Sequence, residues 1–122
     1  MLKSKLNQMA NAKNVWQNDA KRVLCVCSAG LLRSPTLAEY LNKTYGYNTR
    51  ACGTSQEFAL IPISEALVHW ADEVVFVNNE NWEDVKDTPI FKVKKVKILN
   101  LPDEYERNDP ELIKAIEQQY EV

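Results

Sequence analysis

The chain of 122 residues lacks the features that mark several large classes of protein. It has no apolar run near the ~18 residues needed to cross a bilayer, and its first twenty residues are too polar for a secretory signal. Its 15 basic and 17 acidic residues nearly cancel, so charge provides no general attraction to nucleic acid or to an anionic membrane. These absences predict a cytoplasmic protein with no nucleic-acid partner and no membrane partner.

Cysteine and histidine are also scarce. The three cysteines, Cys25, Cys27 and Cys52, are odd in number and are not spaced like a small secreted scaffold, which predicts a reducing compartment and at least one free thiol. These thiols and the single histidine, His69, are too few for a metal site. We expect His69 to be a helix-surface or core residue. The sequence therefore predicts no metal and no other cofactor, and an anion site must be built locally.

The composition is that of one globular domain. The chain is 45% apolar and 26% charged, and 122 residues are enough for a single core without disulfides. Residues 2–17 carry roughly one apolar residue per helical turn, which predicts a weak N-terminal helix. We therefore expect a helical N-terminal extension at 1–20 and a single domain at 21–122.

Apolar patterning after residue 20 alternates between strands and helices. Four strands are predicted at 23–27, 47–52, 73–77 and 93–101. Helical spacing and capping residues predict helices between or after these strands. One follows the first strand and has Pro35 in its first turn, and the others are predicted at 64–72, at 79–85 and from Pro110 onward. This alternation predicts an α/β three-layer sandwich with a four-stranded parallel sheet, in which ligands bind at the carboxyl ends of the strands.

The loop after the first strand, "CSAGLLR", has the residues of a phosphate-binding site. Backbone N–H groups that curl inward before a helix N-terminus form a nest for a tetrahedral anion, and Gly30 permits the positive φ that such a curl often needs. A cysteine near a helix N-terminus and cations can have a pKa of ~3.5–7.5 and react as a thiolate. We therefore expect Cys27 to be a nucleophile at the base of a phosphate-binding loop.

The last residue of the loop and the residue that follows it support this chemistry. The planar fork of Arg33 can hold two phosphate oxygens, and Ser34 can give the thiolate a hydrogen bond. We expect the loop itself to bind substrate through Ser28, Ala29, Gly30, Leu31 and Leu32. A Cys-x5-Arg-Ser string alone occurs by chance, but its position between a buried strand and a proline-started helix favours catalysis. Cys25 is expected to be a core residue.

Longer stretches resemble a known family. "VLCVCSAGLLRSPTLAEYL" followed by "RACGTS" is similar to low-molecular-weight protein tyrosine phosphatases, whose first strand leads into a Cys-x5-Arg-Ser-Pro loop and whose second strand ends in a Gly-Thr-Ser turn. "WADEVVFV" and "LPDEYERNDPEL" resemble a compact bacterial and phage branch of predicted phosphatases. The resemblance covers about residues 22–116 and implies a flavodoxin-like low-molecular-weight phosphatase fold. It also implies that Cys27 is the nucleophile, Arg33 the phosphate clamp and Ser34 the partner of the thiolate.

The same resemblance implies a general acid in a late loop rich in aspartate and aromatic residues. In "PDEYERND" this acid is Asp103, and Tyr105 is an expected wall of the pocket. Residue chemistry alone is less specific: an acid that protonates the leaving oxygen contributes ~10²–10⁴-fold, and Asp103 follows the end of the fourth strand. On that ground a solvated acidic loop that caps the last helix stays an alternative, as do other acids: Glu104, Glu106 and Asp109.

The sequence also departs from the family pattern. Gly30 stands where the family usually has an asparagine that braces the loop, and Leu32 stands where many members have a second cysteine. Cys52 replaces a common alanine and is expected to be a small buried residue. The tryptophan often seen after the Gly-Thr-Ser turn is missing, and Phe58 is the candidate replacement. The resemblance therefore leaves the shape of the substrate pocket open.

These features together predict a phosphomonoester hydrolase of the protein tyrosine phosphatase type with a phosphocysteine intermediate. Its substrate would be a phosphorylated protein or a small aryl phosphate. Three alternatives stay open: a phosphocysteine carrier, since "CSAG" also resembles sugar phosphotransferase components; a non-catalytic phosphate-binding module; and an arsenate reductase. Carrier loops generally lack the arginine, and 78–90 lacks the thiols that arsenate reduction needs, so Arg33 and Asp103 favour hydrolysis.

Overall fold

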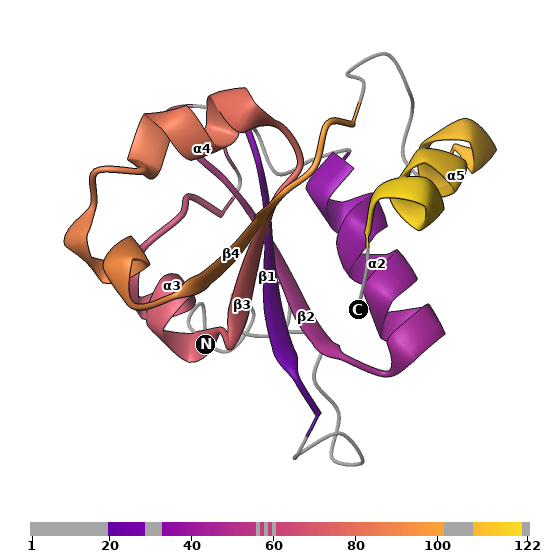
Figure 1. The fold of residues 1–122 in the computed structure, drawn as a ribbon, viewed down its shortest axis with the longest axis horizontal. Coiled ribbons are helices and arrows are strands. Elements are labelled where there is room, and N and C mark those ends of the chain that lie inside the picture. The colour runs from indigo at the N-terminus through magenta and orange to yellow at the C-terminus, as the bar shows by residue number, and fades with distance from the viewer. Residues whose placement is uncertain are drawn as a thin grey trace.

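The computed structural model describes residues 20–28, 33–55, 57, 59, 61–101 and 109–120. In these residues four strands form one parallel sheet in the order β2-β1-β3-β4, which confirms the predicted sheet. The strands are β1 (Arg22–Cys27), β2 (Asn48–Gly53), β3 (Glu73–Phe76) and β4 (Lys95–Ile98). β1, which leads into the cysteine loop, lies inside the sheet (Figure 1).

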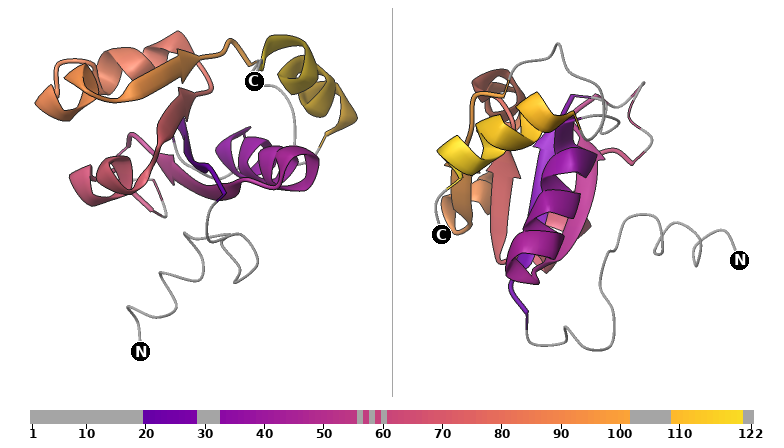
Figure 2. Two further views of the ribbon diagram at one scale, coloured as in Figure 1. Left: turned by 60° about the horizontal axis from the view of Figure 1, so that its bottom comes forward. Right: turned by 90° about the vertical axis from the view of Figure 1, so that its right-hand side faces the viewer.

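Helices cover both faces of the sheet, as expected for a three-layer sandwich. α2 (Arg33–Tyr45) and α5 (Pro110–Gln119) lie on one face, whereas α3 (Glu65–Trp70) and α4 (Asn79–Val85) lie on the other (Figures 1 and 2). A short 3-10 helix, η2 (Pro89–Lys92), packs on the face of α3 and α4. Because the strands are parallel, their carboxyl ends share one edge of the sheet, and Cys27 belongs to that edge.

β1 is apolar from Val23 to Cys27, the part that helices cover on both faces. Val23, Leu24, Cys25 and Val26 are fully buried, and Cys27 is 3% exposed. Alternate side chains serve the two layers: the odd-numbered residues pack towards α2 and α5, and the even-numbered residues pack towards α3 and η2. Burial of each larger aliphatic side chain stabilises the fold by about 1.5–3 kcal/mol. The strand that positions Cys27 is thus the centre of the core.

Local sequence accounts for where α2 begins and ends. Pro35 lies in its first turn, and the apolar residues Leu37 and Leu41, four positions apart, are fully buried against the sheet. The helix stops before Gly46, whose φ of +73° is favourable only for glycine and whose N–H donates to the Asn42 carbonyl at 2.9 Å. The N-terminus of α2 is therefore fixed beside the end of β1.

Two local features differ from the predicted elements. β4 is shorter than the predicted strand at 93–101. Val93 is 87% exposed and precedes the sheet. Beyond the end of β4, the N–H groups of Leu99 and Leu101 still donate to the carbonyls of Phe76 and Val77. The sequence pattern also did not predict η2. The helix expected in residues 2–17 lies outside the described residues. No helix in the described ranges has both the length and the apolar character needed to cross a membrane.

Candidate active site

The structure brings together the predicted nucleophile and its predicted partner. The Sγ atom of Cys27, the last residue of β1, lies 3.1 Å from the Oγ atom of Ser34, the second residue of α2. Cys27 is 3% exposed and Ser34 is fully buried. The contact therefore places a hydroxyl beside the sulfur at the point where the first strand meets the N-terminus of the following helix.

Ser34 can support both charge states of the sulfur. Its hydroxyl lies 3.3 Å from the Cys52 carbonyl oxygen and carries one hydrogen, so it donates either to that carbonyl or to Cys27 Sγ. When Cys27 is protonated, its thiol donates to Ser34 Oγ, and the Ser34 hydroxyl donates to the Cys52 carbonyl oxygen. With a thiolate, rotation of the hydroxyl turns this hydrogen to the sulfur. Ser34 thus gives the thiolate a charge-assisted hydrogen bond, and it loses its 3.3 Å hydrogen bond to the Cys52 carbonyl oxygen.

Arg33 lies at the same edge of the sheet. Its side chain is 8% exposed, and its Nη1 atom donates to the Leu101 carbonyl oxygen at 3.1 Å. Leu101 is fully buried just beyond β4, and Asp103 follows it by two positions in the sequence. The guanidinium therefore connects the start of α2 with the start of the segment that carries the predicted acid.

Backbone contacts support the first residues of the loop. The Thr54 N–H donates to the Cys27 carbonyl at 2.8 Å, and the Ser55 N–H donates to the Ser28 carbonyl at 2.9 Å. Both donors belong to the Gly-Thr-Ser turn after β2. This turn is therefore a support for the end of β1 and for Ser28, an exposed residue that the sequence predicts to bind substrate.

A residue of α4 that the sequence analysis missed also contacts the loop. The Nδ2 atom of Asn81 donates to Ser28 Oγ at 2.9 Å, and Asn81 is 1% exposed. A second contact joins the Thr54 hydroxyl to Asp84 Oδ2 at 3.0 Å. The sequence predicts the helix at 79–85 but gives no signal for these contacts, because each joins residues at least 30 positions apart.

Several predicted site residues lie outside the described residues: Ala29, Gly30, Leu31, Leu32, Asp103 and Tyr105, together with the alternatives Glu104 and Glu106 and the expected wall residue Phe58. Asp109, the remaining alternative acid, is described. It is the N-cap of α5, and its carboxylate accepts from the Glu111 N–H at 2.9 Å. Asp109 therefore has a structural task at the start of α5.

The other thiols differ from Cys27 in their surroundings. None of the three cysteines forms a disulfide bond, and Cys25 and Cys52 are fully buried. Burial, with a smaller contribution from neighbouring thiols, raises the pKa values of Cys25 and Cys52 well above the ordinary value of 9.0, so both stay protonated at neutral pH. They behave as core residues, as expected, and leave Cys27 as the candidate nucleophile.

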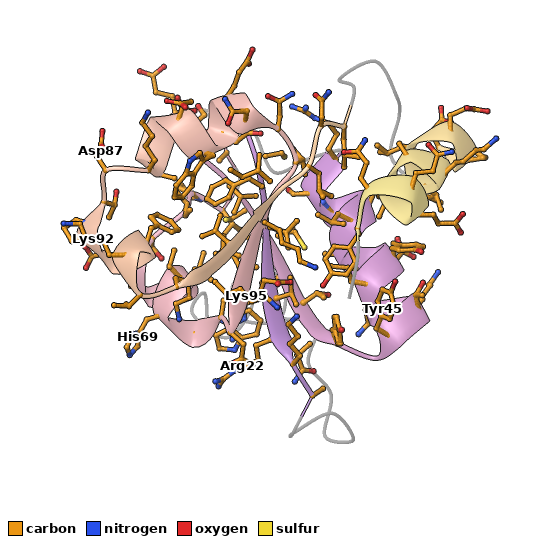
Figure 3. All side chains as sticks on the ribbon, in the orientation of Figure 1. Arg22, Tyr45, His69, Asp87, Lys92 and Lys95 are labelled. Atoms are coloured by element: carbon orange, nitrogen blue, oxygen red, sulfur yellow. The ribbon has the colours of Figure 1, made fainter. Side chains whose placement is uncertain are left out.

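The described residues give no sign of a metal centre. In these parts of the chain, no group of three or more histidine, cysteine, aspartate or glutamate residues could hold an ion. His69 is exposed in the last turn of α3, far from the edge that carries α4, and its side chain points away from the sheet in Figure 3. Of the two expected roles of His69, helix-surface or core residue, the structure shows the first.

Comparison with known proteins supports the fold. No protein-family model matches the chain, and no curated protein sequence matches it. Among solved structures, the YwlE arginine phosphatase from Geobacillus stearothermophilus is similar with 17% identity and a TM-score of 0.60, over 81% of this chain and 85% of that one. A YwlE mutant from Bacillus subtilis is similar with 18% identity and a TM-score of 0.50, over 82% and 88%. The chain therefore has the low-molecular-weight phosphatase fold that the resemblance implied.

Proposed function

We propose that the chain is a phosphomonoester hydrolase of the low-molecular-weight protein tyrosine phosphatase type that acts through a phosphocysteine on Cys27. The observation that carries this proposal is the 3.1 Å contact between Cys27 Sγ and Ser34 Oγ, at the carboxyl end of a central parallel strand and directly before a helix. The phosphatase fold supports the same conclusion, since this edge is where such folds bind their ligands.

In the first step the Cys27 thiolate attacks the phosphorus atom in line with the leaving oxygen. The S–P bond forms as the P–O ester bond breaks, and Asp103 gives its proton to the leaving oxygen. Ser34 stabilises the thiolate before attack. The role of Asp103 rests on the family resemblance, and the bond from Arg33 to Leu101, two positions earlier in the sequence, supports it.

In the second step water cleaves the phosphocysteine. Asp103, now a carboxylate, takes a proton from the water as its oxygen attacks phosphorus, and the S–P bond breaks to regenerate the Cys27 thiolate and release inorganic phosphate. Arg33 and the N–H groups before α2 stabilise the charge that spreads over the phosphoryl oxygens in both steps. The thiolate, the guanidinium and the carboxyl group together account for the reaction without a metal or another cofactor.

The arginine favours hydrolysis over the carrier and binding-module alternatives. A carrier must protect its phosphocysteine from water, whereas a fixed guanidinium stabilises the transition state for attack on it. Arg33 is buried and held at the edge where Cys27 lies. A binding module would not need a buried nucleophile with a hydroxyl at 3.1 Å from its sulfur. Free thiols suit a reducing compartment, so the cytoplasm is the proposed location.

The names of the similar structures add a second candidate substrate class. Both structures carry the name YwlE, and the Geobacillus protein is described as an arginine phosphatase. In phosphoarginine the bond that breaks is P–N rather than P–O, but attack by Cys27 and hydrolysis of the phosphocysteine would be the same. The aspartate would then protonate a guanidine nitrogen. A phosphorylated protein is the substrate class in either case, with tyrosine or arginine as the modified residue.

The full chain with an aryl phosphate tests the proposed reaction. We expect turnover that a chelator does not change, together with complete loss of turnover in Cys27→Ser, because a serine hydroxyl is far less nucleophilic than a thiolate. Cys52→Ser is the matched control, since that thiol lies on the other face of the sheet, and it should retain turnover. Full activity of Cys27→Ser, or complete inhibition by chelator, would contradict the mechanism. Phosphate release from phosphotyrosine and phosphoarginine peptides then separates the two substrate classes.

A further inference from the structure

We propose that Asn81 is a positioning residue for the phosphate-binding loop: its side-chain amide fixes the Ser28 hydroxyl so that this hydroxyl donates to a phosphoryl oxygen bound beside Cys27. The inference rests on the proposed function. It gives a task in the reaction to α4, an element that the predicted set of site residues does not include.

The surroundings of Asn81 point towards the loop. The residue is 1% exposed, and its Nδ2 atom donates to Ser28 Oγ at 2.9 Å across 53 positions of sequence. Its Oδ1 atom is buried and accepts no hydrogen bond from the residues that the structure describes. A buried amide that leaves its oxygen unpaired is unfavourable as a packing residue. Its contact with Ser28 is therefore the feature that explains an asparagine at this position.

Ser28 is held from two sides. The Ser55 N–H fixes its carbonyl at 2.9 Å, while Asn81 fixes its hydroxyl oxygen from α4. α4 begins at the same edge, because it follows β3 closely in the chain and the Val77 N–H between them donates to the Val26 carbonyl of β1 at 2.9 Å. The position of Ser28 is thus set by hydrogen bonds from the turn after β2 and from α4.

The direction of the hydrogen bond decides what the hydroxyl can do. An amide NH₂ group only donates, so Ser28 Oγ is the acceptor and its own single hydrogen is directed to another acceptor. Ser28 is exposed and follows Cys27 directly, so this hydrogen is available to an oxygen of a phosphoryl group that Cys27 attacks. A donor that is oriented in advance stabilises charge in the transition state without reorganisation.

The test compares variants of the full chain with an aryl phosphate as substrate and with inorganic phosphate and vanadate as inhibitors. We expect Asn81→Ala to lower kcat on the order of tenfold and to weaken vanadate similarly, while KM and phosphate inhibition change by less than about threefold. Ser28→Ala, at an exposed position, should give the same loss. In the Ser28→Ala background, Asn81→Ala should change kcat by less than about twofold.

Three further variants separate positioning from folding. Asn81→Asp keeps the shape, but its carboxylate accepts the Ser28 hydrogen and turns it from the phosphoryl group, so kcat should fall further than in Asn81→Ala. Asn79→Ala removes an exposed asparagine from the same helix and should leave kcat unchanged. Asn78→Ala removes the cap of α4 and should lower thermal stability with little change in kcat.

Some outcomes would overturn the inference alone. These are wild-type kcat in Asn81→Ala or Asn81→Asp, additive losses in the double variant, or equal losses of kcat in Asn81→Ala and Asn78→Ala at equal loss of stability. A wild-type protein without turnover would instead overturn the proposed function and this inference with it. An active wild type that loses turnover in Cys27→Ser keeps the proposed function intact whatever the Asn81 variants show.

Discussion

Arg33 is the side chain whose shape can be separated most directly from its charge. A lysine at this position keeps the positive charge but cannot offer two parallel N–H donors to a phosphoryl group. If the guanidinium binds the transition state more tightly than the ground state, Arg33→Lys should lower kcat by about 10²–10³-fold. Inhibition by inorganic phosphate should change much less. Equal losses in kcat and in phosphate affinity would identify Arg33 as a general anchor and favour a binding module.

Ser34 tests the hydrogen bond to the sulfur. Ser34→Ala removes the donor that a Cys27 thiolate would use, and a hydrogen bond to a charged group is worth about 1.5–3 kcal/mol, so kcat/KM should fall by roughly 10–100-fold. Steady-state kinetics with an aryl phosphate measure this loss. Ser64→Ala is the matched control, because Ser64 caps α3 by accepting from the Leu67 N–H at 3.3 Å. That variant should lose stability but not activity, and an unchanged Ser34→Ala would remove Ser34 from the proposed mechanism.

The sequence predicts some of these residues much better than others. Cys27, Arg33 and Ser34 lie in a short string between a strand and a helix, so local pattern is enough to single them out. Asn81 gives no such signal, since an asparagine in the first turn of a short helix is typical of a cap and its partner Ser28 is 53 positions away. Long-range contacts between polar side chains depend on how elements pack, and a local pattern does not contain that information.

Variants in the late loop and at the start of α5 test which of the candidate residues is the general acid. Asp109 is the N-cap of α5, and loss of such a cap costs about 1 kcal/mol. We therefore expect Asp109→Ala to lower the free energy of unfolding by about that amount while kcat for aryl phosphates stays unchanged. Asp103→Asn should instead slow substrates with poor leaving groups far more than those with good ones, since a stable phenolate needs little help from an acid.

A leaving-group series on both variants, with Glu104→Gln beside them, measures this difference. Asp103→Asn should also accumulate phosphocysteine, because the same carboxylate activates the water of the second step, and mass spectrometry after an acid quench detects it. If the loss of kcat does not depend on the leaving group in Asp103→Asn but grows steeply with poorer leaving groups in Asp109→Ala, the general acid is Asp109 at the start of α5. If none of the three variants shows a loss of kcat that depends on the leaving group, and the wild type keeps a long-lived phosphocysteine, the phosphocysteine carrier is favoured.

The main elements follow from local pattern because each has a strong apolar period or a clear end signal. The buried run of β1 and the helical spacing of α2, closed by Gly46, are examples. η2 was missed because a single 3-10 turn is too short for a period to show. β3 was placed correctly, but the full burial of its charged first residue, Glu73, was not foreseen.

Glu73 connects segments from across the fold at the end of the sheet opposite to Cys27. Its side chain is fully buried, with Lys21 Nζ at 3.3 Å, Lys95 Nζ at 3.2 Å and the Tyr120 hydroxyl at 3.0 Å. These partners come from the residue before β1, from β4 and from the C-cap of α5. In Figure 3, Arg22 lies in the lower part of the view, away from α4, and Lys95 lies above it, nearer to the middle (Figures 1 and 3). The cluster therefore ties the first, third and fourth strands to the last helix.

The same cluster predicts how stability depends on pH. Burial raises the pKa of Glu73, but hydrogen bonds from Tyr120 and Lys95 and the charge of Lys21 lower it more, so the folded pKa lies below its ordinary value of 4.5. The unfolded chain thus binds a proton at a higher pH than the folded chain. The contribution of Glu73 is complete well above pH 4.5 and is lost as the pH falls through the lower folded value.

We expect Glu73→Gln to lower the free energy of unfolding by about 1.5–3 kcal/mol at pH 7, because it removes the charge from three polar contacts. Urea denaturation from pH 7 to pH 3 should show the gap between wild type and variant closing as the wild-type carboxylate becomes protonated. Glu83→Gln, which breaks an exposed pair with Lys86, is the control and should leave stability nearly unchanged at every pH. A gap for Glu73→Gln that stays constant down to pH 3 would mean that its charge does not stabilise the fold, and that the glutamate is retained for packing and for its bond with Tyr120.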